Sequence, residues 1–235
     1  MTERNRADIG IIGALDAEVS RLIENLEDSL TERVGGVDFH LGTLSGKRVV
    51  IARCGVGKVF ASLTAEAMII KYSPRLLVNT GVGGAISGGI AQCDMVFADR
   101  LVQHDMDTSP LGDPKGLISG INKVFFDADP HAVSVLKCEA ESMGVGYRIG
   151  TVASGDVFVA EQSTKERIAA DFGAIACEME GAAIAQVAFV NDTPFAVVRA
   201  ISDCADGDAA LDYPAFLPIA AERSYSLTLA LIQSY

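Results

Sequence analysis

Hydrophobic residues follow two alternating patterns along the chain. Short apolar runs that stop at polar or glycine positions predict buried strands, and apolar residues spaced three and four apart between them predict amphipathic helices. The predicted strands are residues 8–13, 37–44, 48–52, 76–80, 95–102, 150–153, 174–177 and 195–201. The predicted helices are residues 15–26, 58–71, 130–143, 179–189 and 216–232, with one more at the capping-box pattern Ser163-Thr164-Lys165-Glu166.

The alternation of strands with helices over the whole chain predicts the fold class α/β. The segment Ser45-Gly46-Lys47 joins two of the strands as a hairpin, which makes the sheet mixed. We find no linker, repeat or low-complexity segment, so we expect a single domain over residues 1–235. The expected architecture is three-layer α/β/α around a central mixed, mostly parallel twisted sheet. Residues 104–129 form one long irregular stretch, and such a loop is usually functional or mobile.

Composition narrows the classes of partner. The net charge of −12 and the lack of a basic run argue against nucleic-acid backbones and anionic membranes as partners. The first eight residues are polar and charged, unlike a signal peptide, and no apolar run is long enough to span a bilayer. We therefore expect a soluble, cytoplasmic protein that binds a small molecule.

Two carboxylates stand where apolar strand-like runs stop. Glu180 follows Met179 at a strand-to-helix junction, and Asp203 follows Ser202 after the last predicted strand. Ligands of open α/β sheets bind at strand ends. A carboxylate such as Glu180 can accept hydrogen bonds from the two hydroxyls of a ribose diol, and one such as Asp203 can be a general acid if it is kept protonated.

Other candidate residues leave alternatives open. Glu18 lies in the first turn or so of the first predicted helix, where a carboxylate suits the helix dipole as well as chemistry. Arg199 lies inside an apolar strand, where a guanidinium needs a carboxylate or a bound oxygen nearby, either as a structural ion pair or as part of a site. Phe158 follows Ser154-Gly155-Asp156 and either stacks on a base or packs in the core.

Several motifs point away from other chemistries. The glycine turns, Gly55-Val56-Gly57 and Gly81-Val82-Gly83-Gly84, match neither a dinucleotide fingerprint nor a phosphate loop with its lysine. His104-Asp105-Met106-Asp107 resembles a metal cluster in composition, but no second ligand motif accompanies it, so we favour a role in ordering the loop. We predict no cofactor and no metal.

The motifs together resemble the 5′-methylthioadenosine/S-adenosylhomocysteine nucleosidases of the purine nucleoside and uridine phosphorylase superfamily. The resemblance runs from Ile9 to the C-terminal helix and is most specific in Glu178-Met179-Glu180 and in the segment from Val198 to Asp203. It implies a nucleoside phosphorylase-like fold. It also implies hydrolysis of the N-glycosidic bond of methylthioadenosine and S-adenosylhomocysteine.

The resemblance also implies roles. Asp203 would share a proton with N7 of adenine, Glu18 helped by Arg199 would activate water, and Glu180 would hold the ribose hydroxyls with Met179 against the sugar. The other substrate-binding residues that it implies surround these groups: Phe158 stacked on adenine, Val159 reading its edge, Ser202 placing Asp203, the alkylthio-pocket residues Val56, Tyr213 and Phe216, and Ala14, Val82, Cys177 and Glu178. A homodimer is expected, with contacts near Leu101, Val102 and Leu111.

Water is the expected acceptor in place of phosphate. Nucleoside phosphorylase relatives hold phosphate with arginines at two places where this chain has Ala17 and Asn79. Phosphate beside a carboxylate without those arginines is electrostatically disfavoured. The alternatives are a phosphate-dependent purine nucleoside phosphorylase and a non-catalytic nucleoside-binding protein on the same fold. Val82 stands where some relatives carry serine, and Cys177 where they carry an aliphatic residue.

Overall fold

The computed structural model describes residues 6–203 and 209–235, with only the backbone described for residue 203 and for residues 209–217. Its strands are β1 Ile9–Gly13, β2 Glu27–Val34, β3 Val37–Leu44, β4 Lys47–Arg53, β5 Leu76–Ala85, β6 Met95–Gln103, β7 Phe125–Asp127, β8 Tyr147–Ser154, β9 Ala174–Glu178 and β10 Phe195–Asp203. Its helices are α1 Asp16–Glu24, α2 Lys58–Tyr72, the short 3₁₀ helix η2 Ser109–Leu111, α3 Pro130–Met143, α4 Gln162–Phe172, α5 Gly181–Val190 and α6 Ala209–Ser234.

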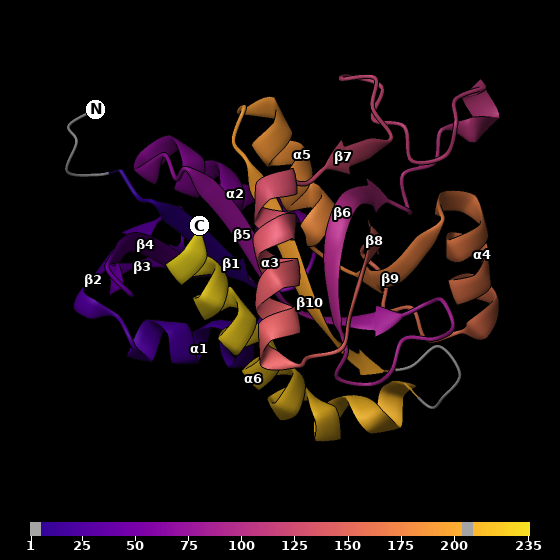
Figure 1. Ribbon diagram of the computed structural model, residues 1–235. Coiled ribbons are helices and arrows are strands. Elements are labelled where there is room, and N and C mark those ends of the chain that lie inside the picture. Colours follow the sequence, from indigo (N-terminus) through magenta and orange to yellow (C-terminus); the bar gives the residue numbers. More distant parts are fainter. Residues whose placement is uncertain (1–5, 204–208) are drawn as a thin grey trace.

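One mixed sheet runs through the molecule in the order β10-β6-β8-β9-β5-β1-β4-β3-β2, and β10 also pairs with β5. That extra pairing closes five strands into a ring, from which β1 and the β4-β3-β2 meander extend (Figure 1). Parallel pairings join β1 to β4 and β5, β5 to β10, and β8 to β6 and β9. Because β1, β5 and β10 are parallel neighbours, their carboxyl ends meet at one edge of the sheet.

Helices cover both faces of the sheet, which gives the expected three layers (Figure 1). Ala65 and Met68 of α2 and Ile184 of α5 belong to one buried cluster. Leu22 of α1, Leu136 of α3 and Leu231 of α6 belong to a second cluster, on the other face of the strands. The burial of small and branched side chains on both faces explains the apolar runs in the sequence, since a covered sheet needs no polar face.

The structure confirms most predicted elements and corrects others. Helix α3 begins after Asp129, whose carboxylate accepts the Ala132 N–H, and ends at Gly144 in the left-handed region, as its sequence predicts. The capping-box prediction at Ser163 is wrong, because α4 already begins at Gln162 with Glu161 as its N-cap and no side-chain cap hydrogen bond. Residues 104–129 are less irregular than expected, since they contain η2 and β7.

The glycine run after residue 80 is strand and not the turn that the sequence suggests. β5 continues to Ala85, and Gly81, Gly83 and Gly84 pair with residues of β10. Among the described residues, no helix is long and apolar enough to cross a membrane.

Candidate active site

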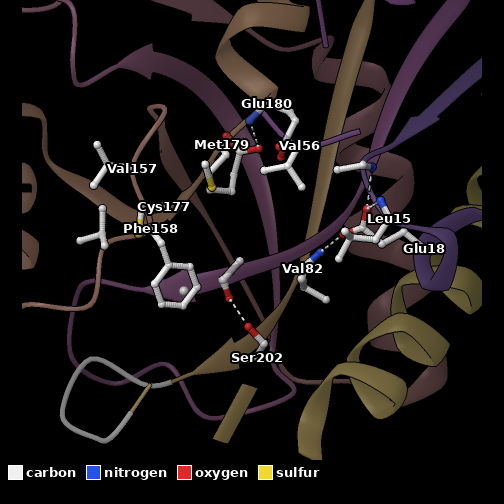
Figure 2. Close-up of a pocket in the computed structure, with 15 residues that line it drawn as sticks. Leu15, Glu18, Val56, Val82, Val157, Phe158, Cys177, Met179, Glu180 and Ser202 are labelled. Carbon is white, nitrogen blue, oxygen red and sulfur yellow. Dashed lines mark hydrogen bonds between the residues drawn. The ribbon is translucent and has the colours of Figure 1, made fainter. Parts of the chain in front are cut away.

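A pocket opens where β1, β5, β9 and β10 end (Figure 2). Apolar side chains and glycine backbone make most of its wall. Three carboxylates, from Glu18, Glu178 and Glu180, interrupt this wall. The full lining comprises Ala14, Leu15, Glu18, Val56, Val82, Gly83, Gly84, Val157, Phe158, Val159, Cys177, Glu178, Met179, Glu180 and Ser202.

The Glu18 carboxylate is held by two backbone amides that follow β1 and by one amide within β5. Its Oε2 accepts the N–H groups of Ala14 at 2.7 Å and Leu15 at 2.9 Å, and its Oε1 accepts the Val82 N–H at 3.0 Å. Glu18 is the third residue of α1, so it also satisfies amides at the start of that helix. The structural and the chemical interpretations of this residue are therefore compatible, because Oε1 keeps room for a further donor such as water.

Burial dominates the protonation of Glu18. Desolvation raises the pKa of its carboxyl above the ordinary value, although the charge of Arg199 and the three amide hydrogen bonds act in the opposite direction. A raised pKa brings a carboxylate closer to the strength that a general base needs near neutral pH. The site requires Gly81 beside it, since a Cβ at that position would lie 2.3 Å from Glu18 Oε1.

Glu180 is the N-cap residue of α5, and its side chain reaches across to another helix. Its Oε1 accepts the Gly57 N–H, at the start of α2, at 2.8 Å. Burial and the neighbouring Glu178 carboxylate raise the pKa of Glu180 to about 7, against the lowering effects of Arg199 and the Gly57 N–H. This carboxylate is buried, with only 7% of the residue exposed, yet it lines the pocket.

Glu178 and Arg199 form a buried ion pair behind the pocket. Glu178 Oε2 also accepts the N–H groups of Glu180 at 3.0 Å and Gly181 at 2.7 Å, and its Oε1 accepts a short hydrogen bond from Ser154. Burial opposes ionisation, but Arg199 and these donors hold the pKa of Glu178 below its usual value. Glu178 therefore fixes the turn that carries Glu180.

Arg199 does not line the pocket. It is 1% exposed, and besides Glu178 it donates to the side chain and the backbone carbonyl of Asn79. Arg199 acts on the pocket electrostatically, since its charge lowers the pKa of Glu18. The ion pair that the sequence left as an alternative is thus present, with a carboxylate from β9.

Phe158 lines the pocket and is half-exposed. Its 52% exposure argues against the core-packing alternative. Figure 2 shows Phe158 and Ser202 in one part of the pocket and Glu18 and Leu15 in another. Ser202 Oγ donates to Gly83 O at 3.4 Å.

Most predicted site residues converge on this pocket. Glu18 and the predicted substrate-binding residues from Ala14 to Ser202 all line it, including Val82, Cys177 and Met179. Only the backbone of Asp203 is described, at the end of β10, and the side chains of Tyr213 and Phe216 lie outside the described residues. Sequence reasoning missed Leu15, Gly83, Gly84 and Val157. Leu15, Gly83 and Val157 each adjoin a predicted residue, and Gly84 follows Gly83, so adjacency in the sequence was the available signal.

No lysine or arginine belongs to the described lining of the pocket. The two positions that the phosphorylases use for phosphate are occupied differently here. Ala17 is exposed, and the Asn79 amide is committed to Arg199 and, at 2.9 Å, to Ile12 O. Among the described residues, no group of His, Cys, Asp and Glu side chains could hold a metal ion.

Glu180→Gln should make the stability of the protein less sensitive to pH. In the wild type the native carboxyl, with a pKa of about 7 against an ordinary 4.5, binds more protons than the unfolded one between these values. Stability therefore falls as pH rises through this window, by about 3 kcal/mol for this group. Urea unfolding at pH 5 to 8 should show a smaller decline in the variant, while Glu166→Gln, at an exposed glutamate, should behave as the wild type. Parallel curves for wild type and Glu180→Gln would contradict the assignment.

Comparison with known proteins agrees with this geometry. A family model described as the phosphorylase superfamily matches residues 8–233. A 5′-methylthioadenosine/S-adenosylhomocysteine nucleosidase of Haemophilus influenzae is 36% identical over 225 residues, which cover 95% of this chain and 98% of that protein. The chain belongs to this nucleosidase family of the phosphorylase superfamily.

Solved structures of the superfamily share the fold of this nucleosidase family member. The structure of a mutant 5′-methylthioadenosine/S-adenosylhomocysteine nucleosidase (MTAN) of Helicobacter pylori, with 5′-methylthioadenosine in its active site, has a TM-score of 0.93 at 31% identity. The match covers 97% of this chain and 99% of that one. The futalosine hydrolase of Helicobacter pylori also has a TM-score of 0.93 at 31% identity, with full coverage of both chains.

Proposed function

We propose that this protein hydrolyses the N-glycosidic bond of 5′-methylthioadenosine and S-adenosylhomocysteine, releasing adenine and the 5′-thio-ribose. The observation that carries the proposal is an apolar pocket that holds the carboxylates of Glu18, in the first turn of α1, and of Glu180, at the start of α5, with no cation in its described lining. Such a pocket suits a neutral nucleoside with an apolar thioether and a polar diol.

The roles follow from this arrangement. Glu180 accepts hydrogen bonds from the 2′- and 3′-hydroxyls, and Phe158 stacks on the base. Asp203 protonates N7 of the purine, so the electrons of the breaking C1′–N9 bond move into a neutral leaving group. Glu18 takes a proton from water as its oxygen bonds to C1′ of the oxocarbenium-like sugar. Arg199 acts behind the pocket by fixing Glu178 and stabilising negative charge.

Water is the acceptor because no described cation of the pocket can bind phosphate. The nearest guanidinium, Arg199, is bound to Glu178. A phosphate dianion would face the Glu18 and Glu180 carboxylates, because the charge of Arg199 is already balanced by Glu178.

A product assay tests the proposal. The protein is incubated with methylthioadenosine, S-adenosylhomocysteine, adenosine, inosine and futalosine, each with and without phosphate, and free base and sugar are measured. Adenine release from the two thionucleosides at equal rates in both buffers is expected. Release that requires phosphate would overturn hydrolysis, and binding without turnover would favour a nucleoside-binding protein.

Asp203→Asn should lower kcat by about 10³-fold while substrate binding largely persists, since the amide cannot deliver a proton to N7. Single-turnover kinetics separate the chemical step from binding, and calorimetry with the inactive variant gives its dissociation constant for methylthioadenosine. Near-normal turnover of Asp203→Asn would refute the acid role.

The proposal includes a homodimer, supported by an exposed apolar face of α2 and α5. Phe60, Leu63 and Ile70 of α2 are 57%, 60% and 63% exposed, and Val190 of α5 is 58% exposed. The contact predicted at Leu101 and Val102 is wrong, since both side chains are fully buried in their own subunit, whereas Leu111 is 84% exposed. Cys54, Cys93, Cys138 and Cys177 form no disulfide bond, which fits the cytoplasm as the proposed compartment.

Leu63→Glu should shift the protein from dimer to monomer, because a charge would have to be buried in the apolar contact. Light scattering after gel filtration measures the mass, and Glu24→Gln, outside this face, is the control. A wild type that runs as a monomer, or a variant that stays dimeric, would exclude this face as the dimer contact.

A further inference from the structure

Two parts of the pocket meet at the N-terminus of α2. The Gly57 N–H donates to Glu180 Oε1 and the next amide, of Lys58, donates to Asp156 Oδ1, each at 2.8 Å. The positive end of the helix dipole favours both carboxylates. One helix end therefore holds the sugar-side carboxylate and the start of the loop that carries Phe158.

The side chain of Lys58 adds a second connection. Its Nζ lies 2.6 Å from Asp105 Oδ1 and 3.1 Å from Gln103 Oε1, and Asp105 Oδ2 accepts the Asp156 N–H at 3.0 Å. Burial would raise the pKa of Asp105, but these two donors hold it below its ordinary value. The bonds form a closed cycle from the Lys58 ammonium through Asp105 and Asp156 back to the Lys58 amide.

The loop fits tightly against its neighbours on this side. Gly57 has φ +100°, and a Cβ there would lie 3.1 Å from Asp156 Oδ1. A Cβ on Gly155 would lie 2.4 Å from Nε2 of the His104 ring. Val157 and Phe158 are 51% and 52% exposed, whereas Val159, at the end of the loop, is buried in a hydrophobic cluster. The hydrogen bonds at residues 155 and 156 therefore hold the start of the loop, and the burial of Val159 holds its end.

We infer that Lys58, Asp105 and Asp156 form a strap that positions the base-side loop, residues 155–159, relative to Glu180. The inference rests on the proposed function, since the ligand of the loop is the adenine of that substrate. The strap residues are positioning residues and touch no reacting atom. Losing the strap should weaken binding of the base in substrate and transition state alike, so KM rises while kcat changes little.

Substitutions of two strap residues, Lys58 and Asp105, test the inference. Lys58→Met keeps the aliphatic stem and the helix amide but removes the ammonium, and Asp105→Ala removes the acceptor. We expect each to raise KM for methylthioadenosine and the dissociation constant of adenine about 10-fold, with kcat within about 2-fold of wild type. The double variant should be no worse than either single one, because both break the same cycle.

Two further variants serve as controls. Asp105→Asn keeps one acceptor oxygen and should recover part of the affinity, and it serves as the probe if Asp105→Ala does not fold. Asp171→Asn breaks the Lys115–Asp171 ion pair, which has the same 2.6 Å distance as the Lys58–Asp105 pair. Because Asp171 lies on α4, outside the strap, this variant should leave KM unchanged.

Several outcomes would overturn the strap. The first is an adenine dissociation constant within about 2-fold of wild type in both Lys58→Met and Asp105→Ala. The second is a KM of the double variant that equals the sum of the two single effects on the free-energy scale. The third is a loss of kcat that parallels a loss of thermal stability. Hydrogen exchange of the ligand-free protein gives a readout that is independent of turnover. Strap variants should exchange faster at residues 155–159 and not at α4, so this result still decides the strap if the wild type releases no adenine.

Discussion

Glu18→Gln is expected to lower kcat for methylthioadenosine by about 10³-fold. Glutamine cannot take the proton of the attacking water. Its amide nitrogen would also face one set of backbone N–H donors, because Ala14 and Leu15 donate to one oxygen and Val82 to the other. At least one of these backbone N–H groups loses its acceptor, so we expect a stability loss of about 1–2 kcal/mol as well.

Glu24→Gln is the matched control, since Glu24 is an exposed residue in the last turn of the same helix. It should change neither kcat nor the unfolding midpoint. Steady-state kinetics with the adenine product measured directly, together with urea unfolding, separate chemistry from stability. Turnover of Glu18→Gln within about 5-fold of wild type would exclude Glu18 as the general base.

Arg199→Met is expected to destabilise the fold by about 3–5 kcal/mol, the largest stability effect among the site residues. The methionine fills part of the volume, but it leaves the Glu178 carboxylate buried without its guanidinium. Because Glu178 also holds the Glu180 and Gly181 amides, the turn that bears the Glu180 carboxylate should loosen, and KM should rise.

The double variant Arg199→Met/Glu178→Gln tests this reason. A neutral amide at position 178 removes the unpaired charge, so the double variant should be more stable than Arg199→Met alone. Lys115→Met, which breaks a partly exposed ion pair, should cost no more than about 1 kcal/mol. Equal losses in the Lys115 and Arg199 variants would mean that burial of the ion pair has no energetic consequence.

The sequence predicts the helices and strands whose buried faces produce a regular pattern of apolar residues. Helix α3 is bounded by its capping residues, and the buried strands follow apolar runs. Strand β2 was missed because it lies at the edge of the sheet, where most of its side chains are exposed and carry no apolar pattern. The extension of β5 was missed because glycines suggest turns, whereas here Gly81 leaves room for the Glu18 carboxylate.

The sequence predicts which residues belong to the candidate site, but it does not predict which side chains pair with one another. Motif resemblance gathers Glu18, Phe158, Glu178 and Glu180, and the structure brings them to one pocket. The sequence also implies that Arg199 needs a carboxylate. It cannot select Glu178 for that partner, since the choice depends on strands β9 and β10 both lying beside β5 in the closed ring.

The backbone amides that donate to Glu18 can report the protonation state of its carboxylate in an NMR experiment. The N–H groups of Ala14 and Leu15, which follow β1, and of Val82, within β5, all donate to one carboxylate. Protonation of that carboxylate weakens all three hydrogen bonds together. Their proton chemical shifts should therefore titrate with a single common midpoint, above the usual range for a glutamate because burial raises this pKa. An NMR titration of the unmodified protein would thus measure the protonation of the proposed base without any substitution.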